Sequence, residues 1–579
     1  MQLTVTYAVD PNRAKEVNPA DIPAKLVRAR TLHQEGELAQ AKLIYEDILK
    51  TDPRNSEVLN LSGLIAAQTN NLQLAADLMD KAIECDPHNV EAYCNKGTLL
   101  RQLNKWDEAL VCYDRAIAID TNLAAAHYNR GSVLRELREF HAALASYDRA
   151  IEINADFAEA QYGRGLILQV LQQNEAALAS YDLAIAIEDD YAEAYSSRGH
   201  ALMDLGQLDA ALVSLSRAIM INGDYLPAYT NRGNSFVRLN RLDEALADFD
   251  RAVALDPDDA TAHYARSLAL LSRGEFAAGW IEYEWRWKAE GTSTFEQKSI
   301  FPRSLHPLWL GRESIAGKNV LLYMEQGLGD AIQFCRYAKM AAALGAQVIL
   351  EVHESLAVLL SDLDGVSRLV TRGSTLPAFD YQCPLLSLPL AFNTTIDSIP
   401  SGKYLVSDPI KVEHWQTKLA GLVDKTQPLI GLVWSGNPTH ANDRNRSIPF
   451  ADLILHLPRN YRYISLQKEV HEMDRAAFES NRDIFTFSGD LKDFSDTAAL
   501  CECLDLVISV DTSVAHLSGA LGKRTWILLP FSPDWRWLLD RDYSPWYPRV
   551  KLYRQKQIGD WNGVLNQVSS DLFQAFNIG

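Results

Sequence analysis

The chain has 579 residues, of which 47% are hydrophobic and 23% charged, a composition typical of a globular protein with several domains. Its formal net charge of −19 at pH 7 argues against nucleic acid or an anionic membrane surface as a partner, because both require a basic face. The sequence holds no run of about 18 apolar residues and its first residues do not resemble a signal peptide, so we expect no membrane span and a cytoplasmic protein.

Residues 1–21 are expected to form a tail, and a repeat with a period of 34 residues begins after them. Small residues recur at fixed positions of this period, which is that of the tetratricopeptide repeat, a pair of short helices that cross closely. The glycine series is Gly63, Gly97, Gly131, Gly165, Gly199 and Gly233. We predict a superhelix over residues 22–293, with seven repeats and a degenerate capping repeat. Their first helices are expected to start at Ile22, Ser56, Val90, Ala124, Ala158, Ala192, Leu226 and Ala260.

Stacked repeats of this kind form a concave groove lined by the first helix of each pair. Asn95, Asn129 and Asn231 all occupy the sixth position of that first helix. This pattern resembles the asparagine ladder with which the superhelix of O-GlcNAc transferase holds an extended polypeptide, although other repeats carry Leu, Gly or Ser at the same position. The residues are therefore candidates for acceptor binding, and the alternative is that they solvate the wall of the groove.

Three tryptophans end the eighth repeat, where earlier repeats have Tyr-Asp-Arg-Ala. Trp280, Trp285 and Trp287 are spaced roughly as on one helix, and large aromatic side chains in such a pattern most often bury a seam. We expect them to cap the superhelix against the next domain, and a platform for stacking a sugar is the alternative. Residues 294–317 are expected to connect the two parts.

From Lys318 onward, apolar strand patterns alternate with helical ones, which predicts two doubly wound parallel sheets. The first half is expected over residues 318–410 and the second over residues 411–579. The carboxyl ends of the strands would face each other and form a cleft. The predicted strands are residues 320–324, 347–352, 367–370, 379–383, 429–434, 463–467, 484–487, 506–510 and 525–529.

A glycine turn follows the first strand. Gly327-Leu-Gly329-Asp330 separates this strand from an amphipathic helix predicted over residues 331–344. Asp330 would lie in the first residues of that helix, where a carboxylate serves either as a proton acceptor or as a plain helix cap.

A polar loop follows the first strand of the second half. It contains Asn437, His440, Arg444 and Arg446, and guanidinium groups suit the oxygens of a diphosphate. The sequence does not decide which arginine would bind it. Gln467, at the end of the next strand, is a candidate for a nucleoside contact by its position alone.

A second unit of strand, turn and helix lies near the end of the chain. An apolar run typical of a buried strand stops at Asp511, Thr512 and Ser513, and His516 lies in the first turn of the helix that follows. The start of a helix offers unpaired amides and the positive end of its dipole, so this segment suits a phosphate. An ordinary capped helix is the alternative, because Asp, Thr and Ser all favour such positions.

The glycine turn at Asp330 and the segment Asp511-Thr-Ser-Val-Ala-His-Leu517 together resemble the two signatures of the heptosyltransferase-like GT-B glycosyltransferases of family 9. The resemblance covers about residues 318–570. Fusion to a tetratricopeptide superhelix is similar to the architecture of O-GlcNAc transferase and of bacterial glycosyltransferases that modify flagellin.

The resemblance implies transfer of a sugar from a nucleotide-sugar, with inversion and without a metal or another cofactor. Asp330 matches the catalytic base of the family. Asp511, Thr512, Ser513 and His516 match the site that binds the donor diphosphate. The family commonly has Gly where this chain has Ser513, and the first α/β half is short for GT-B, so the superhelix would supply part of the acceptor side. Asp362-Leu-Asp364 has the form of a metal-binding Asp-x-Asp, but it lies in a polar turn.

The function expected from these observations is glycosylation of a protein, with a Ser or Thr hydroxyl as acceptor and flagellin as one candidate substrate. A scaffold with a silent glycosyltransferase-like module is the first alternative. A transferase acting on a lipid-linked or lipopolysaccharide acceptor is the second, and the acidic charge argues against it. Whether the repeats form a homo-oligomer is left open.

Overall fold

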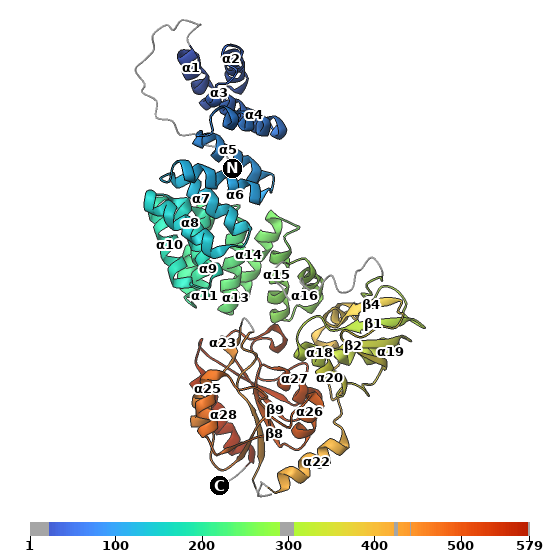
Figure 1. Cartoon of the computed structure of the whole chain (residues 1–579). Helices are drawn as coiled ribbons and strands as arrows, with labels where there is room; N and C mark the ends of the chain where they lie inside the picture. The colour runs from blue at the N-terminus through green and yellow to red at the C-terminus, as the bar shows by residue number, and fades with distance from the viewer. Residues whose placement is uncertain (1–21, 290–305, 422–426, 440–441, 577–579) are drawn as a thin grey trace. The chain divides into compact units, whose positions relative to one another are not determined.

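The computed structural model describes residues 22–289, 306–421, 427–439 and 442–576. It divides into two compact units, Met1–Tyr225 and Leu226–Gly579 (Figure 1). The predicted tail, the first half of the predicted connection and His440 lie outside the described residues.

The first unit consists of helix pairs, and every pair starts where the 34-residue period predicts it. The helices follow one another from α1 to α12 in the blue and cyan part of Figure 1. Their bounds are α1 Ile22–Gln34, α2 Leu38–Thr51, α3 Ser56–Gln68, α4 Leu72–Cys85, α5 Val90–Gln102, α6 Trp106–Ile119, α7 Ala124–Glu136, α8 Phe140–Ile153, α9 Ala158–Val170, α10 Asn174–Ile187, α11 Ala192–Asp204 and α12 Leu208–Ile221.

The recurring glycines are the positions where the two helices of a pair touch. A Cβ atom added at Gly97 or Gly131 would lie 2.9 Å from the ring of a tyrosine on the second helix, and at Gly165 only 2.5 Å from Tyr181. The recurring alanines, such as Ala177, are fully buried at the same crossings. The periodic small residues are therefore set by close packing.

We predict that Gly165→Ala destabilises the first unit by about 1–3 kcal/mol, because the new methyl group overlaps the Tyr181 ring in a packed core. Urea unfolding followed by far-ultraviolet circular dichroism measures the change. Gly223→Ala is the matched control, since a Cβ there meets no atom closer than 3.9 Å. Equal stability of the two variants would contradict this explanation of the period.

The second unit begins with four helices that continue the repeat pattern and end in a short 3₁₀ turn. Trp280 is buried in one core cluster with Leu322 of the first sheet, and its indole N–H donates to the carbonyl oxygen of Thr394 at 2.9 Å. Trp285 stacks on His263, with ring centres 4.1 Å apart. Trp280 thus packs the end of the repeats against the first sheet, whereas the contact of Trp285 lies within the repeats. The bounds are α13 Leu226–Arg238, α14 Leu242–Leu255, α15 Ala260–Arg273, α16 Phe276–Tyr283 and η1 Glu284–Trp287.

The first sheet has four parallel strands in the order β3-β2-β1-β4. The strands are β1 Asn319–Tyr323, β2 Gln347–Val352, β3 Val366–Thr371 and β4 Tyr381–Pro384. The single helix predicted over residues 331–344 is wrong, because a 3₁₀ turn interrupts it at the buried Arg336, which donates to the carbonyl oxygens of Pro400 and Trp546. The helical segments are α18 Leu328–Phe334, η2 Cys335–Tyr337, α19 Ala338–Ala343, α20 Glu354–Ala357, η3 Leu385–Ser387, α21 Leu388–Ala391, η4 Ile396–Ser398 and α22 Pro409–Ala420.

The second sheet has six parallel strands in the order β10-β9-β8-β5-β6-β7. Its strands are β5 Leu429–Val433, β6 Arg462–Ser465, β7 Ile484–Thr486, β8 Leu506–Val510, β9 Thr525–Leu529 and β10 Val550–Arg554. The sequence reasoning missed β10. The helical segments are α23 Asp443–Arg446, α24 Phe450–His456, α25 Glu472–Ser480, α26 Phe494–Glu502, α27 Ser513–Ala520, η5 Trp535–Trp537 and α28 Trp561–Phe576.

The strand orders mark one place in each sheet where a ligand would bind. In a doubly wound sheet this place lies at the carboxyl ends of two neighbouring strands whose connections run in opposite directions. In the first sheet these strands are β1 and β4, and in the second sheet they are β5 and β8. The loop after β1 leads to Asp330, and the loop after β8 begins at Asp511.

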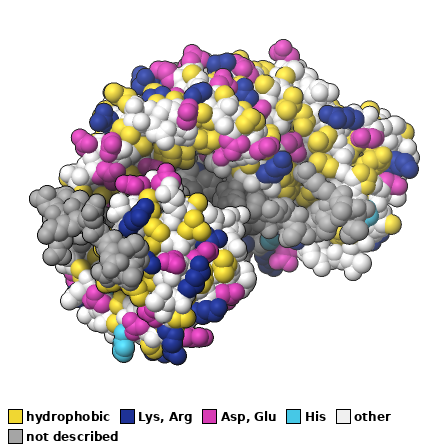
Figure 2. Space-filling model, turned by 90° about the horizontal axis from the view of Figure 1, so that it is seen from above, with side chains coloured by type: hydrophobic (Ala, Val, Ile, Leu, Met, Phe, Trp, Pro, Cys, Tyr) yellow, Lys and Arg dark blue, Asp and Glu magenta, His cyan; other side chains and the backbone are white. Residues whose placement is uncertain are grey.

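The surface carries charges of both signs. On the face drawn in Figure 2, lysine and arginine side chains are interspersed with aspartate and glutamate. In the part of the chain that the structure describes, none of the helices has both the length and the apolar character needed to cross a bilayer.

Candidate functional site

Asp330 is held at both of its carboxylate oxygens. Oδ2 accepts a hydrogen bond from the backbone N–H of Gly327 at 2.8 Å, as a helix-capping carboxylate does. Oδ1 accepts one from Nη2 of Arg536, a residue 206 positions later in the chain. The side chain of Asp330 keeps 18% of its surface exposed, so solvent or a ligand can still reach it.

Arg536 is the central cation of the site, and the sequence reasoning missed it. It lies in η5, in the loop that follows β9, and only 8% of its side chain is exposed. Nη1 donates to Asp534 at 2.9 Å and Nε donates to Gln333 at 2.8 Å. The guanidinium also lies over the Trp535 ring, 4.4 Å from its centre. The only local feature is that Arg536 lies between two tryptophans in the loop after β9, and this pattern does not indicate which residue the arginine contacts.

The start of α27 provides backbone amides beside Asp511. Thr512 occupies the N-cap position, and its hydroxyl lies 3.0 Å from that of Ser509 rather than capping the helix. Unless a side chain caps them, the first amides of a helix are suited to an anion. Thr512 and Ser513 are both half-buried residues at this place.

The starts of α18 and α27 are in direct contact. A Cβ atom on Gly329 would lie 3.0 Å from the His516 ring and 3.4 Å from Cα of Ser513. A side chain at position 329 would therefore push the two helix starts apart. The structure brings together Asp330, Ser513 and His516, which lie far apart in the sequence.

His516 is buried and Asp511 is largely buried, with 7% and 16% of their side chains exposed, and this loss of contact with water changes their ionisation. The His516 ring lies 3.0 Å from the Tyr547 hydroxyl and stacks on Trp537. Burial lowers the pKa of His516 well below its ordinary value, and nearby arginines lower it further, so the imidazole is neutral at pH 7. Burial, together with the charge of Asp534, raises the pKa of Asp511 to about 6.

The polar loop after β5 brings one of its two arginines to this place. Nη1 of Arg446 donates to the backbone oxygen of Asp511 at 3.0 Å, and Nε donates to Asp443 at 3.2 Å. Arg444 is exposed, and so is Asn437, which accepts a hydrogen bond from the backbone N–H of Thr439. Of the two arginines, it is Arg446 that reaches the start of α27, and its binding of a phosphate remains a prediction.

Gln467 is a support for that loop. Its side chain is buried, and Nε2 donates to the backbone oxygen and the hydroxyl of Ser435, both at 3.0 Å. A nucleoside contact by Gln467 remains a prediction.

The three predicted groove asparagines are each half-buried on a first helix, namely α5, α7 and α13. Nδ2 of Asn95 donates to Asn60 at 3.1 Å, so this amide supports the neighbouring helix of the first unit. Asn231 belongs to the second unit, whereas Asn95 and Asn129 belong to the first. Their binding of an acceptor remains a prediction.

We predict that Asp511→Asn stabilises the second unit at pH 8 by about 2–3 kcal/mol. The folded state raises the pKa of Asp511 above its ordinary value of 3.8, so the free energy of unfolding falls as the pH rises from about 4 to 6. An asparagine does not ionise, so the variant does not lose this stability. The gain should be about half as large at pH 5. Urea unfolding followed by tryptophan fluorescence reports this unit, because of the twelve tryptophans only Trp106 precedes Leu226.

Asp364→Asn is the matched control, since its carboxylate is 72% exposed and pairs with the equally exposed Lys339. No change of stability, or a gain that is the same at pH 5 and pH 8, would show that Asp511 is not destabilised by burial.

Comparison with known proteins identifies the helical part. Models of the tetratricopeptide repeat match residues 26–90, 78–111, 97–137, 124–157, 192–225 and 233–274. Protein FlbA of Caulobacter vibrioides is 29% identical over 342 residues, which cover 54% of this chain and 55% of FlbA. The chain thus spans about half the length of this distant relative. The N-terminal part of the present chain consists of tetratricopeptide repeats, and a parallel α/β region follows them.

Three solved structures are similar to parts of the chain. YrrB, described as a TPR protein with an unusual peptide-binding site, is 27% identical with a TM-score of 0.29, and the match covers 33% of this chain and 100% of YrrB. MamA is 26% identical with a TM-score of 0.27, covering 28% of this chain and 94% of MamA. A tetratricopeptide repeat protein from Parabacteroides merdae is 17% identical with a TM-score of 0.35, covering 43% of this chain and 98% of that protein.

Proposed function

We propose that the protein is an inverting glycosyltransferase that moves a sugar from a nucleotide-sugar to a hydroxyl group of a protein. The observation that carries the proposal is the contact between the starts of α18 and α27, which brings a carboxylate, Asp330, beside helix amides suited to a diphosphate. Both helices begin at the ligand-binding edges that the strand orders predict.

Asp330 is the proposed general base. The acceptor hydroxyl passes its proton to this carboxylate as its oxygen attacks the anomeric carbon, and the bond from that carbon to the diphosphate breaks on the opposite side. The hydrogen bonds from Gly327 and Arg536 fix the orientation of this carboxylate, so that it is held in place when the acceptor hydroxyl approaches.

The leaving diphosphate is proposed to bind at the start of α27. Amides of the first helical turn and the hydroxyls of Thr512 and Ser513 would donate to its oxygens, and Arg446 would supply positive charge. His516, being neutral, would act as a hydrogen-bonding group rather than as a cation. These residues fit a donor site that works without a metal ion or another cofactor.

The repeats support a protein as the acceptor, because superhelices of this kind bind extended peptides in their groove. Mass spectrometry of intact proteins from cells with and without this protein tests the proposal. We expect at least one protein to carry an added mass equal to that of a sugar residue only when the protein is present. The absence of any such mass difference, in cells that express the protein, would oppose a protein acceptor.

A catalytically silent docking module is the second candidate. One observation favours it: Asp330 and Asp534 are already paired with Arg536 inside the protein, as in a purely structural ion-pair network. Nucleotide binding separates the two functions, because only the transferase requires it.

A further inference from the structure

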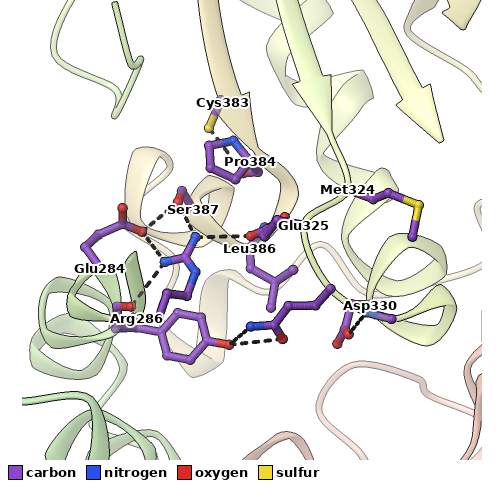
Figure 3. A network of polar contacts seen from close by, with 12 residues as sticks. Glu284, Arg286, Met324, Glu325, Asp330, Cys383, Pro384, Leu386 and Ser387 are labelled. Carbon is purple, nitrogen blue, oxygen red and sulfur yellow. Dashed lines mark hydrogen bonds and ion pairs between the residues drawn. The ribbon is translucent and has the colours of Figure 1, made fainter. Parts of the chain in front are cut away.

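The last turn of the repeats ends in a fully buried arginine, Arg286, whose side chain is 0% exposed. Nη1 donates to Glu284 at 2.6 Å, within the same turn. Nη2 donates to Ser387 at 2.7 Å and to Glu325 at 3.1 Å, as Figure 3 shows. The arginine therefore joins η1 to two loops of the first sheet.

These two loops are the ones at the ligand-binding edge of that sheet. Glu325 lies two residues after the end of β1, and Ser387 lies three residues after the end of β4. The same oxygen of Glu325 also accepts a hydrogen bond from the backbone N–H of Leu386 at 3.2 Å. Arg286 and Glu325 thus hold together the two strand ends at the point where their connections diverge.

A second bond from the repeats holds the next residue of the chain. Nε2 of Gln326 donates to the hydroxyl of Tyr283, which lies at the end of α16, at 3.2 Å. Gln326 is followed by Gly327, whose N–H donates to Asp330. The two residues immediately before the glycine turn are therefore both held by the last turn of the repeats (Figure 3).

Glu325 depends on Arg286 for its charge. Burial raises the pKa of Glu325 to about 7, and the guanidinium of Arg286 opposes that rise. Without the guanidinium, this carboxyl would be buried without a cation, and it would protonate or move towards water. Either response would break the contacts of Glu325 that hold the chain just before the glycine turn.

We propose that Arg286 is a positioning residue for Asp330, so that the end of the tetratricopeptide repeats sets the place of the carboxylate. The bonds from the repeats to Glu325 and Gln326, called the structural link below, do not depend on the proposed function. The effect of Arg286 on turnover rests on the proposed function. The repeats then have two tasks, since they hold the acceptor and also complete the site that acts on it.

Hydrogen exchange of the full-length protein, measured by mass spectrometry, tests the structural link. In Arg286→Gln we expect the amides of residues 325–330 to exchange at least tenfold faster, while those of residues 506–520 are unchanged. Arg286→Lys, which restores a cation, should recover part of the protection. Arg273→Gln is the matched control, because this exposed arginine of the same repeat region pairs with Glu275 and Asp243, both of them within the repeats.

If Arg286→Gln folds and the amides of residues 325–330 exchange as slowly as in the wild type, the proposal is overturned. If that variant does not fold, Glu325→Gln gives the decision, because it weakens the same link and keeps a hydrogen-bonding group of the same size. Faster exchange over the whole second unit in Glu325→Gln would show a merely structural role and would also overturn it.

The catalytic consequence has its own readout. In Arg286→Gln we expect kcat for release of nucleotide from the donor to fall at least tenfold, and the Kd of the nucleoside diphosphate to stay within about threefold. Unchanged kcat despite faster exchange would overturn the positioning role. If the wild type binds no nucleotide, the proposed function fails instead, and the exchange experiment still decides whether the repeats hold the turn.

Discussion

Asp330→Asn should lower kcat for sugar transfer by about 10² to 10⁴-fold, because an amide cannot take the proton of the acceptor hydroxyl. The fold should survive, since an amide oxygen can still accept the hydrogen bond from Gly327. The release of nucleotide from a panel of nucleotide-sugars measures kcat, and titration calorimetry measures the affinity for the nucleotide product. That affinity should change by less than about threefold, because the loss is confined to the transition state.

The control for this variant is Asp534→Asn. It also removes a carboxylate that pairs with Arg536, but Asp534 is not the proposed proton acceptor. Its effect on kcat should therefore be much smaller than that of Asp330→Asn. If Asp330→Asn keeps more than half of the wild-type kcat, the base lies elsewhere.

Arg536→Gln should destabilise the second unit by about 3–5 kcal/mol, because it leaves two carboxylates close together without their shared cation. Asp330 should also lose its fixed orientation, so kcat should fall with stability. Urea unfolding followed by tryptophan fluorescence measures the first effect, and nucleotide release measures the second.

The double variant Asp534→Asn with Arg536→Gln should regain part of the stability, since it removes one of the two carboxylates left unpaired. Arg475→Gln serves as the control, because this arginine is exposed and pairs only with the neighbouring Glu472. Stability of Arg536→Gln within about 0.5 kcal/mol of the wild type would mean that the buried network does not hold the site together.

The repeats were predictable almost residue by residue because their constraint is local and periodic. Gly97 and Gly131 recur because the tyrosines of the following helices leave no room for a side chain. The buried parallel strands were predictable for a similar reason, since continuous apolar runs such as β8 indicate a strand covered on both faces. The last strand, β10, lacks that signal, because Lys551 and Arg554 interrupt its apolar residues and both are only half-buried.

The candidate site was predictable only in part. Asp330 and Asp511 each belong to a turn that their own neighbours in the sequence define. Arg536, by contrast, functions through a partner 206 residues away, and no local pattern reports such a contact. The choice between Arg444 and Arg446 likewise depended on which one the folded loop turns towards Asp511.

The central claim is that the start of α27 binds the diphosphate of a nucleotide-sugar. Titration calorimetry of the full-length protein with UDP, ADP, GDP and CMP tests it most directly. We predict that one of these nucleotides binds with a stoichiometry of one, and that Arg446→Ala weakens its binding at least tenfold, or by about 1.4 kcal/mol. If none of the four binds, or if binding is the same in Arg446→Ala and Asp511→Ala as in the wild type, the contact between the two helix starts is not a donor site.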